Sequence, residues 1–168
     1  MIYNQHNRSI DKKKLDEIRI KLNQAFKLDV RNSHILNVEK KILNIEDNCI
    51  GRFAGHIEDY ILLYYSVYTH YLKKRNKSLP VIEIGTLFGC STILIWHAIK
   101  DAKAEAVIYA IDPLDGYYAV KKSGESALRP KDIVTGLEVD ESTVRGNLEQ
   151  FGISEKECEL ITDLSQSS

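Results

Sequence analysis

The chain has 168 residues, of which 43% are hydrophobic and 28% charged, values typical of a single soluble globular domain. Its formal net charge of −1 argues against a nucleic-acid binder that works through bulk charge. No apolar run approaches the roughly 20 residues that span a bilayer, and no secretory signal opens the sequence. The three cysteines are far apart in sequence and lack metal-ligand spacing. We therefore expect reduced thiols, no metal site and a cytoplasmic protein without membrane segments.

The first third of the chain contains no proline and, up to residue 50, no glycine, and it is predicted to be helical. Apolar residues recur at three- and four-residue steps after Ser9, a plausible N-cap, and again from about residue 33. A pair of glycines marks a break after these two amphipathic helices. We expect a third helix, rich in tyrosine, from about 57 to 74. Residues 1–54 are thus predicted to form a helical extension.

The pattern changes at Pro80 from helical spacing to short β-branched runs. Residues 81–84 (VIEI) and 106–111 (AVIYAI) predict two strands, the first of them buried with one polar residue inside it. A glycine-bracketed turn and a helix over 91–100 separate the two strands. Residues 114–139 have no assignable regular structure, and a connection of that length is typical of a lid, a binding loop or a disordered stretch.

A last helix is expected to begin after Asp140, its N-cap, and to stop at Gly152, before a third strand at 158–162. The order strand, helix, strand, long crossover, helix, strand is βαβαβ, one mononucleotide-binding half of a doubly wound α/β sheet. Right-handed crossovers would place the parallel strands in the order 3-2-1. Residues 55–168 are therefore predicted to form a Rossmann-like portion.

The turn that follows the first strand holds the candidate binding residues, because ligands of open α/β sheets bind at the carboxyl ends of strands. Gly85 would allow a sharp turn, and Gly89 would allow a close approach to a ligand or to the strand. Glu83 lies in a buried strand and needs hydrogen bonds. It would either accept from the loop or a ligand amine, or simply pin the turn. Asp112 would accept from ribose hydroxyls or form a turn before Pro113.

The glycine spacing excludes two common nucleotide-binding motifs. The sequence has neither the G-x-G-x-x-G of dinucleotide oxidoreductases nor the G-x-x-x-x-G-K-[ST] of phosphate loops. No lysine follows Gly89, so nothing is placed to neutralise a triphosphate. A ligand with less phosphate charge is favoured, and a nucleotide oxidoreductase stays open as a less favoured alternative.

Three segments resemble the first three motifs of class I S-adenosylmethionine-dependent methyltransferases: residues 83–92 (EIGTLFGCST), 111–113 (IDP) and 160–166 (LITDLSQ). The branch they look most like is that of catechol-O-methyltransferase and related small-molecule methyltransferases. The resemblance implies a Rossmann-like fold, S-adenosylmethionine as the cofactor and a small molecule as the methyl acceptor. It places Glu83 near the methionine amine, Gly85, Thr86, Gly89 and Ser91 along the methionine and sugar, Asp112 at the ribose, and Ser165 and Gln166 at the adenine.

In the resembled branch, the catalytic base and the metal ligands come from the fourth strand and the loops after it. This sequence ends before that strand, so we name no catalytic residue and no metal. We expect the chain to be a fragment, or half of an assembly in which the exposed edge of the first strand pairs with a second copy or a partner chain. The alternative is a non-catalytic, truncated Rossmann-like domain that binds a nucleoside-type ligand or a partner.

Two further features have simple interpretations. Tyrosines recur along one flank of the third predicted helix, which favours a half-buried helix face with phenolic tips in water over an aromatic acceptor pocket. The residues concerned are Tyr60, Tyr64, Tyr68 and Tyr71. The position of Cys90 at a helix start would permit a lowered pKa, but no base neighbours it in sequence, and we do not expect a nucleophile.

Overall fold

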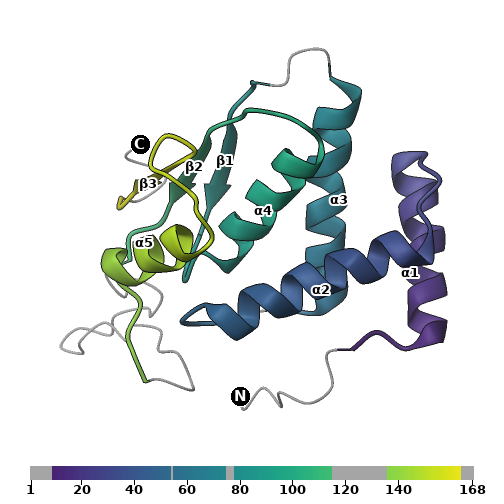
Figure 1. Cartoon of the computed structure of the whole chain (residues 1–168), viewed down its shortest axis with the longest axis horizontal. Helices are drawn as coiled ribbons and strands as arrows, with labels where there is room; N and C mark the ends of the chain where they lie inside the picture. The colour runs from purple at the N-terminus through teal and green to yellow at the C-terminus, as the bar shows by residue number, and fades with distance from the viewer. Residues whose placement is uncertain (1–8, 54, 75–77, 115–135, 164–168) are drawn as a thin grey trace, which may run out of the picture.

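The computed structural model describes residues 9–53, 55–74, 78–114 and 136–163, and within them it contains five helices and a three-stranded sheet. All of the predicted helices and strands are present, with bounds that differ by a few residues at most. In chain order (Figure 1) the elements are α1 Lys12–Phe26, α2 Asn32–Asn48, α3 Ile57–Lys73, β1 Val81–Ile84, α4 Cys90–Asp101, β2 Ile108–Ile111, α5 Glu141–Gln150 and β3 Cys158–Ile161.

The N-terminal helices begin somewhat differently from the sequence prediction. Ser9 does not cap α1; instead Oδ1 of Asp11 accepts the backbone N–H of Lys14 at 2.8 Å. Aspartate caps at least as well as serine, and only Asp11 stands immediately before the first helical turn. At the other end of the chain, Asp140 caps α5 as predicted, through the N–H of Thr143.

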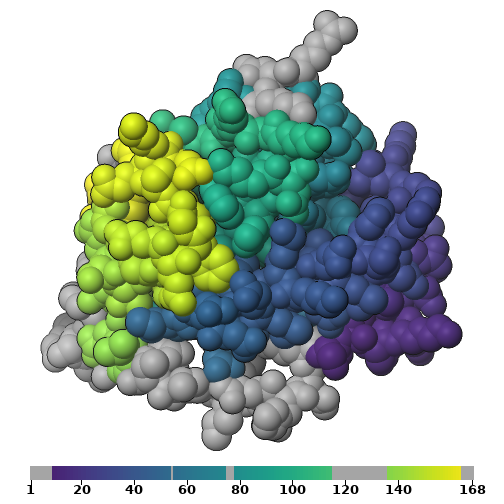
Figure 2. Space-filling view, viewed as in Figure 1, coloured from purple at the N-terminus to yellow at the C-terminus, as the bar shows by residue number. Residues whose placement is uncertain are grey.

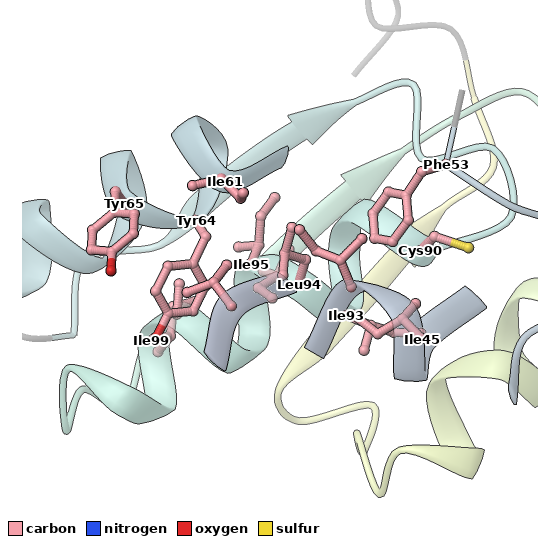
Figure 3. Close-up of a cluster of buried hydrophobic side chains, with 14 of the residues drawn as sticks. Ile45, Phe53, Ile61, Tyr64, Tyr65, Cys90, Ile93, Leu94, Ile95 and Ile99 are labelled. Atoms are coloured by element: carbon pink, nitrogen blue, oxygen red, sulfur yellow. The ribbon is translucent and has the colours of Figure 1, made fainter. Parts of the chain in front are cut away.

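The helices form a layer beside the sheet (Figure 1), in which α3 packs against α4, and α1 and α2 pack on α3 and on each other. The apolar faces of α1 and α2 are buried, as the three- and four-residue spacing predicts. They belong to the same hydrophobic cluster as α4 and the inner face of the sheet. Ile45 of α2, Ile93 of α4 and Phe53, for example, are all members of this cluster (Figure 3).

The sheet is parallel, and its order β1-β2-β3 is the predicted order 3-2-1 viewed from the other edge. In its register Ile82 pairs with Tyr109 and Ile84 with Ile111. The prediction of β1 as a buried strand is wrong in one respect, because Ile82 and Ile84 are 65% and 68% exposed. Within the described residues no strand pairs with the outer edge of β1, and side chains alternate between the two faces of a strand. Only the face that carries Val81 and Glu83 is turned to the helices and partly buried.

None of the helices in the described ranges is both long and apolar enough to cross a membrane.

Candidate functional site

The loop at residues 85–89 turns the chain sharply from the carboxyl end of β1 into α4. Gly85, Leu87 and Gly89 all have positive φ values, of 85°, 52° and 82°, the region that disfavours side chains. A Cβ on Gly85 would meet no atom within 4 Å, so its backbone angle is what requires glycine there. At Gly89 a Cβ would lie 3.3 Å from Cγ1 of Val144 in α5. Gly89 therefore allows the loop to approach α5 closely.

Glu83 joins β1 to the start of α4 through hydroxyl groups. The hydroxyl of Thr92 donates to its Oε2 and also contacts the hydroxyl of Thr86, and Ser91 is a further hydrogen-bond partner. Although Glu83 keeps some exposed surface, its carboxyl group is buried, and this burial raises its pKa against the opposing effect of the three hydroxyls. The carboxyl group therefore holds the turn in place.

Asp112 is fully buried at the end of β2 and links two loops. Its Oδ2 accepts the N–H of Leu87 at 2.8 Å, and its Oδ1 accepts the N–H of Leu114 at 3.0 Å. The second bond is the turn that an aspartate before proline favours. The first fixes the glycine loop to the neighbouring strand.

The structure brings together those predicted site residues that it describes. Glu83, Gly85, Thr86, Gly89, Ser91 and Asp112 all lie at the carboxyl ends of β1 and β2 or in the first turn of α4. Ser165 and Gln166, predicted at the adenine, lie outside the described residues, as does 115–135 of the long connection. Among the residues described, no group of three or more His, Cys, Asp or Glu side chains is placed to hold a metal ion.

Asn147 of α5 supports the loop, and the sequence reasoning missed it. Its Nδ2 donates to the carbonyls of Ile50, at 2.7 Å, and Phe88, at 2.8 Å, while its Oδ1 accepts the N–H of Ile50 at 2.9 Å. The side chain is 2% exposed. One signal was available, since Asn147 stands between Val144 and Leu148 on the apolar stripe of its helix, where a polar residue needs buried partners.

The segment after α2 packs directly on this loop. Gly51 has a φ of 89°, and a Cβ there would lie 2.1 Å from Cγ of Phe88, so only glycine allows the approach. The side chains of Cys49, the C-cap of α2, and Cys90 hydrogen-bond to each other, although they are 41 positions apart in sequence. This bond and burial raise the pKa of Cys90. The lowered pKa that the sequence permitted is therefore wrong, and a thiol held protonated is a poor nucleophile.

The tyrosines of α3 do not face the glycine loop as one acceptor wall. Tyr60 packs on Phe53 with ring centroids 4.2 Å apart. The Tyr71 hydroxyl donates to the carbonyl of Leu79. The Tyr64 hydroxyl donates to Asp101, which ends α4 at the opposite end from the loop.

No protein-family model matches this sequence, and no curated protein is significantly similar to it.

Proposed function

We propose that this chain provides the cofactor-binding portion of an S-adenosylmethionine-dependent methyltransferase that acts on a small molecule. The observation that carries the proposal is the pair of carboxylates, Glu83 and Asp112, at the carboxyl ends of adjacent parallel strands. A loop with left-handed residues, fixed by the bond from Leu87 N–H to Asp112, lies between them. Open α/β sheets bind nucleotides at such strand ends. The sequence resemblance to class I methyltransferases supports the same cofactor.

The chemistry of the two carboxylates suits the two polar ends of this cofactor. The carboxyl group of Glu83 is buried and has a raised pKa, and an ammonium group beside it would favour its charged form. Asp112 is the carboxylate expected at the ribose hydroxyls, and the space beside Gly85, where a Cβ would meet no described atom within 4 Å, leaves room for a ligand to approach the backbone. The bound cofactor would supply an electrophilic methyl group. The chain's own part is to hold and orient it.

Calorimetry with S-adenosylhomocysteine tests this proposal, and 5′-methylthioadenosine provides a matched probe because it lacks the amino-acid end. Glu83→Gln should weaken binding of S-adenosylhomocysteine by about tenfold or more, the loss of a charged hydrogen bond, and leave methylthioadenosine nearly unchanged. Asp112→Asn should weaken both ligands. Glu159→Gln, an exposed carboxylate on β3, serves as the control.

Three results would contradict the proposal. The first is no binding of either nucleoside at millimolar concentration. The second is equal weakening of both ligands by Glu83→Gln, which would mean that Glu83 only shapes the loop. The third is tighter binding of NADH than of S-adenosylhomocysteine, which would favour an oxidoreductase.

A second candidate function, assembly with another chain, is favoured by β1, whose outer edge pairs with no strand among the described residues. Ile82 and Ile84 are exposed on the face of this strand that is turned away from the helices, and an apolar unpaired edge strand promotes strand pairing between chains. We propose that a second copy or a partner strand pairs at this edge. Light scattering across a concentration series should show association that Ile82→Lys abolishes. A monomer at every concentration, together with failure to bind any nucleoside, would leave neither function standing.

A further inference from the structure

A cleft of about 730 Å³ lies among the helices, within the ~300–1,000 Å³ range of small-molecule sites. Its walls come from residues 28–30, which connect α1 to α2, from α2 and α3, and from Asp101 at the end of α4. Because α4 has 12 residues, it is about 18 Å long. The glycine loop precedes one end of α4 and the cleft lies at the other, so the two sites are separate.

Three tyrosine rings of α3 form an aromatic corner in this cleft. Tyr64 and Tyr68 are nearly parallel, with an interplanar angle of 11° and centroids 6.0 Å apart. Tyr65 stands edge-on to both, at 79° and 86°. Tyr64 and Tyr65 are buried and belong to the hydrophobic cluster of Figure 3, whereas Tyr68 is only half-buried. The face of a tyrosine ring is electron-rich and attracts a cation placed within about 6 Å of its centroid.

The charged groups of the cleft also favour a cation. Asp101 is the last residue of α4, where the helix dipole already places partial negative charge. Lys41 pairs with Oδ2 of Asp101 at 3.2 Å, so its ammonium is engaged within the wall. Asp29 adds a second carboxylate, and His34 is the other ionisable side chain of the wall besides the tyrosines. The Lys41 ammonium and the Tyr64 hydroxyl both bind the Asp101 carboxylate, so the wall has an excess of one negative charge, contributed by Asp29.

The tyrosine hydroxyls do not add negative charge to this cleft at neutral pH. Burial raises the pKa of Tyr64 and of Tyr65, and for Tyr64 the hydrogen bond to Asp101 acts in the same direction. Both phenols therefore stay protonated. Their rings act through their faces, and the excess negative charge of the wall comes from Asp29.

We propose that this cleft binds a small organic cation of the alkylated-ammonium class, with its charged head against Tyr68 and near Asp29. A cation gains from the ring faces, from the end of α4 and from the carboxylate of Asp29. An anion would meet each of these unfavourably, because the one lysine of the wall is already paired. The inference does not rest on the proposed methyltransferase function, since the two sites share no residue.

Choline and its uncharged isostere 3,3-dimethylbutan-1-ol are the matched probes, because they have nearly the same shape and differ in the positive charge. Saturation-transfer NMR on the full chain should show choline binding more tightly than the alcohol by about five- to thirtyfold, the range expected for a cation on aromatic faces. Choline should not displace S-adenosylhomocysteine. Binding of choline in the cleft can therefore be judged separately from binding of the nucleoside at the glycine loop. Equal binding of the two probes would overturn the proposal. So would a choline signal no larger than that of a protein-free control, measured at about 1 mM choline and about 50-fold excess of choline over the chain.

Variants of the wall separate an aromatic site from non-specific attraction. Tyr68→Ala should weaken choline binding by about five- to thirtyfold, while Tyr68→Phe, which keeps the ring, should bind like the parent chain. Asp29→Asn should weaken it less, and Asp47→Asn, an exposed aspartate of α2 outside the cleft, should have no effect. Circular dichroism checks that each variant is folded. A folded Tyr68→Ala chain with unchanged choline affinity would refute the assignment.

Discussion

Replacing Asn147 by alanine removes a side chain that hydrogen-bonds both the segment after α2 and the glycine loop. Three hydrogen bonds are lost, to the carbonyls of Ile50 and Phe88 and from the N–H of Ile50. The Phe88 carbonyl is left buried without this partner, at about 1–2 kcal/mol, and the two half-buried groups of Ile50 add about 0.5–1 kcal/mol each. We therefore expect Asn147→Ala to lower the free energy of unfolding by about 2–4 kcal/mol.

Urea unfolding followed by the fluorescence of Trp96, the sole tryptophan, measures this loss. The midpoint should fall with little change in slope, and a loss of about 3 kcal/mol corresponds to a melting temperature lower by about 6–12 °C. Asn48→Ala is the matched control, because Asn48 is also a helical asparagine whose amide bonds a carbonyl, that of Asn44 at 2.8 Å, but in an exposed position. If both variants lose the same stability, the burial argument for Asn147 is refuted.

The pKa of Glu157 is lowered to about 2, chiefly by its bond to Lys100. The ionised carboxylate therefore stabilises the folded protein at pH values above the usual carboxyl pKa, and this stabilisation should be lost as the pH falls toward 2. Glu157→Gln should flatten that part of the stability curve, and Trp96, whose indole N–H donates to Glu157, should report the change by fluorescence. Gly51→Ala should destabilise the chain by more than about 2 kcal/mol in the same urea assay. The new Cβ would stand at a residue with positive φ and would clash with the Phe88 ring. A loss of less than about 1 kcal/mol would contradict the packing described. Burial raises the pKa of Cys158 to about 12, so alkylation by iodoacetamide at pH 8, followed by mass spectrometry, should be much slower in the folded chain than in urea.

The order of the helices and strands was predictable because local signals agree with the fold. Apolar spacing in the first third, β-branched runs after Pro80 and the cap at Asp140 each indicate the element that forms, and right-handed crossovers limit the sheet to one order. The bounds are less predictable, as the cap at Asp11 shows. The exposure of Ile82 and Ile84 could not be predicted from their apolar character, because burial depends on what covers a strand and not on the strand alone.

The candidate site was predictable where its residues lie in or directly after a predicted strand, as Glu83 and Asp112 do. The run from Glu83 to Ser91 contains its own signal of strand, glycines and hydroxyls. Asn147 contacts Ile50 across 97 positions, and the Cys49–Cys90 contact likewise depends on how α2 meets α4. Such contacts between distant segments arise from packing, which no local pattern encodes.

The single hydrophobic cluster that runs from α1 and α2 through α4 to the sheet has a consequence for local opening. Regions that share buried contacts tend to open as one cooperative unit. Amides in the middle of α2 and of α4 should therefore exchange with solvent deuterium at similar free energies of opening. The glycine loop, joined to this unit through Asn147 and Asp112, should share this protection. The N-terminal helices would then set how often the loop opens.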